Sequence, residues 1–171
     1  MEVLREPIEK VSIERAATPS IISNEGFSDK AYFDTMGKST IGYGFNMSDP
    51  VIAKFVHPDV KSGKRTMTRE EANSILTTKV MPMVANDARN FVGSKLFDSL
   101  SPASKQVLLD MSYNMGGPRL NGFKNMRAAL QKGDFVTAAQ ELMASDYGRN
   151  KFTRARALRN AKLMLKGVFD E

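Results

Sequence analysis

Apolar residues recur at helical spacing through residues 67–94, which predicts a long helix there. Thr68 and Glu71 near its start have the spacing of a capping box, in which two side chains satisfy backbone N–H groups at a helix N-terminus. Pro82 lies inside the pattern and has no N–H group to donate, so we expect the helix to kink or divide there. The apolar positions that carry the pattern are Ala72, Ile75, Leu76, Val80, Met83 and Val84.

From Ser101 onwards the pattern is helical throughout. Ser101 and Pro102 supply a cap and a first-turn proline, and Gly116 ends the helix that they start. Asp134 is a candidate N-cap for a later helix. We predict helices over about 102–115, 125–131, 134–144 and 153–165, which pack as a separate lobe over residues 95–171.

A different pattern precedes the long helix. Two isoleucines lie before Glu25 and a glycine follows it, which predicts a short helix that ends at Glu25. Between Lys30 and Phe45, aromatic, threonine and isoleucine residues alternate with glycines, as in a small and sharply turned antiparallel sheet. With the helical segments, this predicts an α+β fold of two lobes with a cleft between them, the first lobe covering residues 21–66.

The stretch after the predicted sheet reads as one short helix and a loop. Ser48 or Asp49 can cap a helix that starts near Pro50 and stops before Pro58. Residues 59–65 are polar and predict a loop. Residues 1–20 carry mixed charges, two prolines and a weak apolar repeat, so we expect a loosely packed extension to the first lobe. A linker from a larger virion protein and a strap across the lobe are the alternatives.

Composition narrows the class of protein. The 171 residues include no cysteine, which excludes disulfides and thiol chemistry, and the single histidine offers no metal-ligand cluster. No apolar run reaches the roughly 20 residues of a membrane span, and the N-terminus lacks a signal-peptide pattern. A net charge of +6 favours a polyanionic partner, either nucleic acid or an anionic cell envelope.

The candidate chemistry lies in residues 22–46. Glu25, Asp34 and Thr40 follow the spacing E-x8-D-x5-T, with one acid at a predicted helix end and the other on a strand or turn. Two carboxyl groups in different environments are what glycoside hydrolysis requires, one to protonate the leaving oxygen and one to stay ionised. The alternative is that these are ordinary surface residues.

The longer string E-G-x5-Y-x-D-x2-G-x2-T-I-G-Y-G adds fixed glycines and aromatics to this spacing. It resembles the active-site segment of the phage-type lysozymes, glycoside hydrolase family 24. The resemblance implies catalytic roles for Glu25, Asp34 and Thr40, and supporting roles for Gly42 and Gly44. It also implies that the long helix connects the two lobes on either side of the cleft.

A second block, L-L-D-M-S-Y-N-M-G-G-P-R-L-N-G-F-K-N, is similar to the family's second signature. Carried over by position, Tyr113 lines the saccharide cleft and Asn114 lies near the same wall, while Gly122, Phe123 and Asn125 hold a turn. Core packing is the alternative for Tyr113. Arg154 matches an arginine that pairs with the catalytic glutamate in the family.

The sequence departs from the family pattern at several positions. Phe45 replaces a frequent histidine, and Asn46 replaces an apolar residue of the cleft. Met126 and Glu141 stand where some members use serine and asparagine to contact sugar. We treat Asn46, Met126 and Glu141 as candidate substrate-binding positions whose changes affect glycan preference.

Basic residues gather between 149 and 166, where seven lysines and arginines occur without an acidic residue. A solvated helix face is the usual explanation of such a run. Nucleic-acid binding would call for interleaved aromatics, which are sparse there, so we expect no nucleic-acid partner. The charge suits attraction to an anionic envelope.

The resemblance implies a muramidase that inverts configuration while it cleaves the β-1,4 bond between N-acetylmuramic acid and N-acetylglucosamine in peptidoglycan. We expect a monomer that needs no metal or organic cofactor and does not insert stably into membranes. It would stay in the host cytoplasm until release to the cell wall, or else be carried on a virion tail. A lytic transglycosylase and a non-catalytic envelope-binding module are the alternatives.

Overall fold

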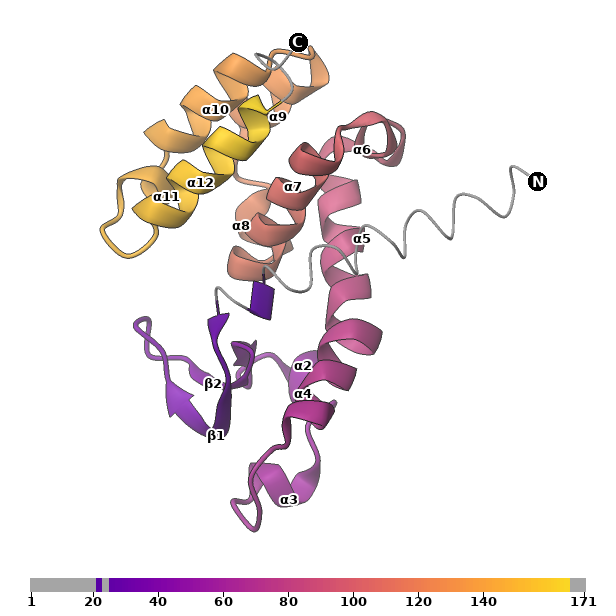
Figure 1. The fold of residues 1–171 in the computed structure, drawn as a ribbon, viewed down its shortest axis with the longest axis vertical. Coiled ribbons are helices and arrows are strands. Elements are labelled where there is room, and N and C mark those ends of the chain that lie inside the picture. The colour runs from indigo at the N-terminus through magenta and orange to yellow at the C-terminus, as the bar shows by residue number, and fades with distance from the viewer. Residues whose placement is uncertain (1–20, 23–24, 167–171) are drawn as a thin grey trace, which may run out of the picture. The chain divides into compact units, whose positions relative to one another are not determined.

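The computed structural model describes residues 21–22 and 25–166 (Figure 1). The chain forms two compact units, with the boundary between Met83 and Val84. A small antiparallel sheet and a majority of helices give the predicted α+β class. The predicted extension over residues 1–20 lies outside the described residues.

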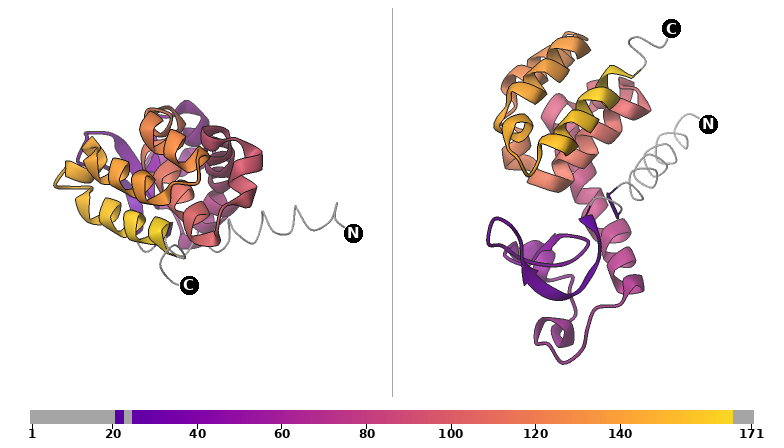
Figure 2. Two further views of the ribbon diagram at one scale, coloured as in Figure 1. Left: turned by 90° about the horizontal axis from the view of Figure 1, so that it is seen from above. Right: turned by 60° about the vertical axis from the view of Figure 1, so that its left-hand side comes forward.

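Unit 1 contains a three-stranded antiparallel sheet, as predicted for residues 30–45 (Figure 2). The strands β1 (Ser28–Phe33), β2 (Ser39–Gly42) and β3 (Phe45–Asn46) follow one another in the sheet. Strand β1 pairs with β2 so that Tyr32 lies opposite Thr40, and β2 pairs with β3 so that Ile41 lies opposite Phe45. The first strand is mostly exposed and the second mostly buried, so the core of the sheet lies on β2.

Aromatic residues attach the sheet to the first long helix. The ring of Tyr43 lies 5.5 Å from that of Phe27 and 6.2 Å from that of Phe45, centroid to centroid. The Tyr43 hydroxyl donates a 2.7 Å hydrogen bond to Oδ1 of Asn73 in α4 (Arg69–Ile75). Because Phe45 is almost fully buried, it contributes about 1.5–3 kcal/mol through removal of its ring from water.

Two short helices separate the sheet from α4. Helix α2 (Pro50–Ala53) is capped by Asp49, whose side chain accepts from the Val51 N–H group. The prediction of a loop from residue 59 was wrong at its start, because Pro58–Lys61 forms the one-turn helix α3. Nδ1 of His57 caps it by accepting from the Asp59 N–H group at 3.0 Å. A histidine cap is weaker as a sequence signal than Ser, Thr, Asp or Asn.

The predicted long helix is present in three consecutive segments. They are α4, the π-helical turn η1 (Leu76–Val80) and α5 (Met81–Val92). The predicted capping box is confirmed, with bonds between Thr68 and Glu71 of 3.0 and 3.1 Å. The wider turn directly precedes Pro82, and the Met81 N–H group reaches back five residues to the Leu76 carbonyl. We interpret this turn as the local adjustment to the N–H group that Pro82 lacks.

Unit 2 is helical, and the four predicted helices are confirmed. They are α7 (Pro102–Met115), α9 (Lys124–Gln131), α10 (Phe135–Ala144) and α12 (Arg154–Leu165). The predicted caps also occur, since the side chains of Ser101 and Asp134 accept from the N–H groups of Ser104 and Thr137. The sequence analysis missed three short helices, α6 (Ser94–Ser99), α8 (Gly117–Leu120) and α11 (Asp146–Arg149).

Helix α7 supplies much of the core of unit 2, because it is buried continuously from Val107 to Ser112. Helices α10 and α12 lie side by side, α10 also packs against α9, and α12 against α7 (Figures 1 and 2). Across the described part of the chain, no helix combines the length and apolar character needed to cross a membrane.

A polar network is buried inside this helical core. The guanidinium of Arg156 donates from Nε and Nη2 to the two carboxylate oxygens of Asp110, each at 3.1 Å. Nδ2 of Asn160 donates to Asp110 Oδ2 at 2.9 Å and to the Tyr147 hydroxyl at 3.2 Å. Burial raises the pKa of the Tyr147 hydroxyl to about 12. The network therefore joins α7, α11 and α12 through side-chain hydrogen bonds.

Candidate functional site

Glu25 lies at the end of a helical turn, as predicted. Ile21, Ile22 and Glu25 are helical, and the Gly26 N–H group donates to the Ile22 carbonyl at 3.0 Å. Gly26 then takes a φ of +67°, a conformation that terminates helices and that glycine adopts without strain. Ile21 is buried, so the turn is anchored in the core of unit 1 while the half-buried Glu25 side chain follows it.

Two glycines shape the sheet around Glu25. A Cβ atom on Gly44 would lie 2.8 Å from Oε2 of Glu25, so the turn between β2 and β3 passes directly over the carboxyl group. A Cβ atom on Gly42 would lie 2.7 Å from the ring of Phe45. Both glycines also have positive φ angles, +66° for Gly42 and +83° for Gly44. The close contacts of an added Cβ atom and the positive φ angles thus both favour glycine at these two positions.

Asp34 follows β1, and its side chain is bound into the turn that leads to β2. Oδ1 accepts hydrogen bonds from the N–H groups of Met36 at 2.9 Å and Lys38 at 2.8 Å. The backbone of the same turn closes with a 2.9 Å bond from the Gly37 N–H group to the Asp34 carbonyl. The carboxylate is therefore held in one orientation by backbone donors of its own turn.

Thr40 shares its anchor with Asp34. Its buried hydroxyl donates to the Lys38 carbonyl at 2.9 Å, and the same carbonyl accepts from the Asp34 N–H group at 2.9 Å. The peptide groups of Lys38 thus contact Asp34 twice and Thr40 once. This arrangement fixes the two side chains relative to each other through a single residue.

Tyr32 is a candidate that the sequence analysis did not assign. It pairs with Thr40 across β1 and β2, and cross-strand partners point to the same face of a sheet. Asp34 lies two residues further on, in the turn that follows β1. The ring is 41% exposed, and burial, the Glu25 charge and the Asp34 charge all raise the pKa of its hydroxyl. The sequence signal that could have identified Tyr32 is its fixed place in the string E-G-x5-Y-x-D, two residues before Asp34.

The remaining predicted residue of unit 1 is Asn46 in β3. Its Oδ1 atom accepts from the Ser48 N–H group at 2.9 Å, and the residue is half-buried. Glu25, Asp34, Thr40, Asn46, Gly42 and Gly44 thus all belong to unit 1.

The other predicted residues belong to unit 2. Tyr113 is half-buried and Asn114 exposed near the end of α7, and Arg154 is exposed at the start of α12. Glu141 in α10 is half-buried, and its Oε2 accepts from Nδ2 of Asn125 at 3.5 Å. Met126 is fully buried in the core of the helices, so its side chain offers no surface to a glycan.

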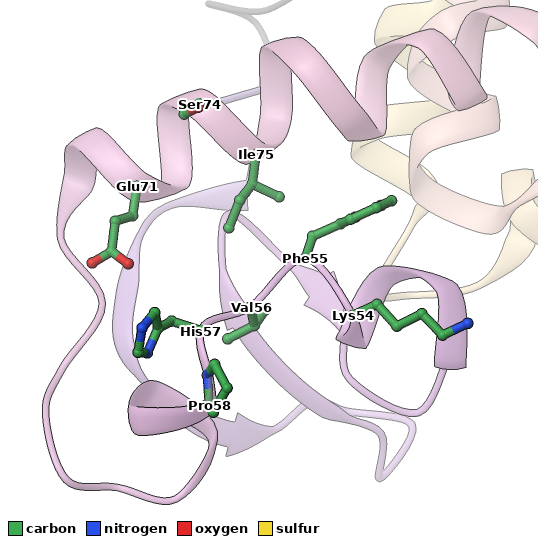
Figure 3. Close-up of a pocket in the computed structure, with 8 residues that line it drawn as sticks. All are labelled: Lys54, Phe55, Val56, His57, Pro58, Glu71, Ser74 and Ile75. Carbon is green, nitrogen blue, oxygen red and sulfur yellow. The ribbon is translucent and has the colours of Figure 1, made fainter.

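A pocket of about 330 Å³ lies elsewhere on unit 1, next to α4 (Figure 3). It is formed by residues 54–58 together with Glu71, Ser74 and Ile75, and it includes none of the predicted catalytic residues. Glu71 is already occupied there by the guanidinium of Arg65, at 2.6 and 2.9 Å. Within the described residues, no group of three or more His, Asp or Glu side chains could hold a metal ion.

The order of these residues along the chain matches that of a known family. A sequence model of the phage lysozyme family matches residues 22–162, which include every predicted site residue. The match covers most of the chain, from the turn before Glu25 almost to the end of α12. Membership implies glycoside hydrolase activity on peptidoglycan as the general function. Because the match extends over residues 22–162, the chain is a member of the phage lysozyme family.

Proposed function

We propose that the protein is an inverting muramidase that cleaves the β-1,4 bond between N-acetylmuramic acid and N-acetylglucosamine. The observation that carries the proposal is the shared anchoring of Asp34 and Thr40 on the peptide groups of Lys38. In an inverting hydrolase one carboxyl group protonates the leaving oxygen, and a second carboxylate must hold and activate a water molecule on the opposite face of the sugar ring. A side-chain pair tied to one backbone segment meets that requirement.

Glu25 is the proposed general acid that protonates the leaving oxygen. The close approach of the Gly44 backbone restricts the space around its carboxyl group. A general acid must keep hydrogen-bond reach to the oxygen that it protonates, so restricted motion favours the reaction.

Asp34 is the proposed general base. Since Oδ1 already accepts two backbone hydrogen bonds, we assign Oδ2 to the attacking water. The Thr40 hydroxyl donates its own hydrogen to Lys38, which leaves its oxygen to accept a hydrogen from the same water. In this scheme the water gives one proton to Asp34 and attacks the anomeric carbon, and Glu25 protonates the departing sugar oxygen. No cofactor takes part, because both proton transfers use side chains.

Tyr32 is a proposed positioning residue in the same site. Its exposed side chain lies opposite Thr40 in the sheet, where it can pack against a sugar ring. Its hydroxyl is close enough to both acids for their charges to raise its pKa, so it stays protonated and able to donate a hydrogen bond.

Substrate binding is assigned to residues from both units. We propose contacts to the glycan from Asn46, Tyr113, Asn114 and Glu141, and a supporting role for Arg154. Met126 is left out because it is fully buried. We further propose that the protein acts as a monomer, kept in the host cytoplasm until release to the wall; carriage on a virion tail is the alternative location.

Chemical analysis of the reaction products tests the proposed activity. Purified peptidoglycan digested by the protein should release fragments with reducing-end muramic acid, and NMR of the freshly formed anomer should show inverted configuration. Products that carry 1,6-anhydro-muramic acid would identify a lytic transglycosylase instead, since a sugar hydroxyl would then have attacked in place of water. Retention of configuration would contradict the roles given to Asp34 and Thr40.

A further inference from the structure

The charge of the protein is distributed unevenly along the chain. Residues 117–166 hold 11 lysines and arginines against three acidic residues, a net charge of +8, whereas the whole chain has +6. The rest of the chain is therefore slightly acidic, with a net charge of −2. All of the excess positive charge belongs to helices α8 to α12 of unit 2.

Helix α12 carries its exposed cations on one side, whereas Arg156 on the other side is paired with Asp110. Its buried residues are Ala157, Asn160, Ala161 and Met164, which face the helical core. Arg154, Leu158, Lys162 and Lys166 follow one another at four-residue spacing on the exposed side, and Arg159 lies beside them. We call these five exposed residues the basic face. Leu158, which is 44% exposed, thus lies one turn from a cation on either side.

An aromatic residue extends the basic face at its N-terminal end. Phe152 lies two residues before α12 and is 68% exposed. The Phe152 N–H group donates to Oδ1 of Asn150 at 2.8 Å, and Nζ of Lys151 lies 5.0 Å from the ring centroid. The segment before α12 thus places a large apolar ring at the surface, next to the ammonium group of Lys151.

We propose that the basic face binds the surface of a membrane that contains anionic phospholipids. Lysines and arginines near such a surface are each attracted by the headgroup charge, and exposed apolar side chains among them can enter the region between headgroups. Exposed Leu158 favours lipid over nucleic acid, because an aliphatic side chain has no role in stacking with bases, and the ring of Phe152 can enter a headgroup region as well. The interaction is peripheral, since the buried side of α12 stays in the helical core. Arg154 is the one residue that the basic face shares with the proposed substrate site.

Vesicle binding tests the proposal directly. The full chain is mixed with vesicles of phosphatidylcholine alone or with added phosphatidylglycerol, and the bound fraction is measured by sedimentation. We expect binding only to the anionic vesicles. Raising the salt from about 0.1 M to about 1 M shortens the screening length from about 10 Å to about 3 Å and should release the protein.

Matched variants locate the binding surface. Arg159→Gln/Lys162→Gln/Lys166→Gln removes three cations of the basic face and should lower the partition coefficient on the order of 100-fold. Lys61→Gln/Lys64→Gln/Lys95→Gln removes the same charge from exposed positions outside α12 and should have a far smaller effect. Phe152→Ser should weaken binding severalfold at unchanged charge. Arg154 is left intact because it belongs to the proposed substrate site.

Three results would overturn the proposal. Equal binding to neutral and anionic vesicles would remove the electrostatic basis, and this comparison needs no variant. An equal loss in both triple variants would show that net charge acts without a defined surface. Release of the vesicle-bound protein by a DNA duplex at equal phosphate concentration would assign the basic face to nucleic acid instead.

Discussion

The hairpin of unit 1 and the helical core of unit 2 hold their polar groups in opposite ways. Asp34 and Thr40 are fixed by backbone atoms of one turn, in a sheet whose first strand is exposed. Asp110, Arg156, Asn160 and Tyr147 are fixed by one another, inside a core of packed helices. The first arrangement leaves functional atoms open to a ligand, whereas the second uses nearly all of them for stability.

The comparison predicts that substitutions of polar residues affect a different property in each unit. Loss of a side chain in the hairpin should reduce activity while unfolding stays nearly unchanged. Loss of a side chain in the buried network should reduce stability first.

The largest expected effect on stability is at Asp110. Asp110→Ala removes the carboxylate that accepts three hydrogen bonds within the core, and loss of one partner of a buried ion pair costs about 3–5 kcal/mol. Urea unfolding followed by circular dichroism measures the change. The control is Asp146→Ala, which breaks the exposed pair with Arg149 and should leave stability within error. Equal effects of the two variants would contradict the role of the network.

Gly44 tests the steric part of the hairpin. In Gly44→Ala the new Cβ atom would lie 2.8 Å from Oε2 of Glu25, so the carboxyl group must move. A displacement of about 1 Å at a reacting group can cost roughly 100-fold in rate, and we expect a loss of that order in peptidoglycan clearing. Gly63→Ala is the matched control, because Gly63 has a similar φ of +80° but no atom within 4 Å of an added Cβ. Similar activity of the two variants would contradict the importance of the contact between Gly44 and Glu25.

Tyr32 gives a further test of the hairpin, because its side chain is exposed to a ligand in the proposed site. Tyr32→Leu removes the ring and should raise KM for a soluble glycan by roughly tenfold, with a smaller change in kcat. Tyr32→Phe keeps the ring and should keep KM, while the hydroxyl next to the two acids is lost, so the pH profile of kcat should shift. A purely structural role would give equal KM values for parent and both variants, with a lower melting temperature in Tyr32→Leu.

The smallest effect is expected at Glu71. The hydrogen bond from Arg65 and the capping box lower the pKa of its carboxyl to about 2, against an ordinary value of 4.5. A lowered folded-state pKa stabilises the protein above pH 4.5, and this contribution disappears as the pH falls towards 2. Since the group is partly exposed, we expect less than about 1 kcal/mol. The difference in unfolding free energy between parent and Glu71→Gln should shrink between pH 6 and pH 3, and a constant difference would contradict this.

Much of the fold could be predicted from local signals. The capping box at Thr68, the cap at Ser101 and the glycine after Glu25 each act within a few residues, so the helix ends that they define were found. Helix α3 was missed because its cap is a histidine. The π turn before Pro82 was not foreseen, since a kink and a wider turn both accommodate a missing N–H group.

Long-range contacts could not be predicted in the same way. Asp110 and Arg156 are 46 positions apart, and nothing in the run of basic residues distinguishes the half-buried Arg156 from the exposed lysines and arginines around it. Met126 was predicted to meet substrate by its position in a motif, yet it is fully buried. For the proposed catalytic residues, the spacing of the string suggested the candidates, while the anchoring through Lys38 depends on the turn that the backbone adopts.

The most direct test of the central claim compares the parent with Glu25→Gln on outer-membrane-stripped Gram-negative peptidoglycan. Loss of turbidity measures cleavage, and sedimentation with the wall material measures binding. We predict that Glu25→Gln clears at least about 100-fold more slowly and binds the wall as well as the parent does. Equal clearing by the two proteins would contradict the assignment of Glu25 as the acid. Binding without clearing by either protein would show a family member whose function is attachment to the envelope.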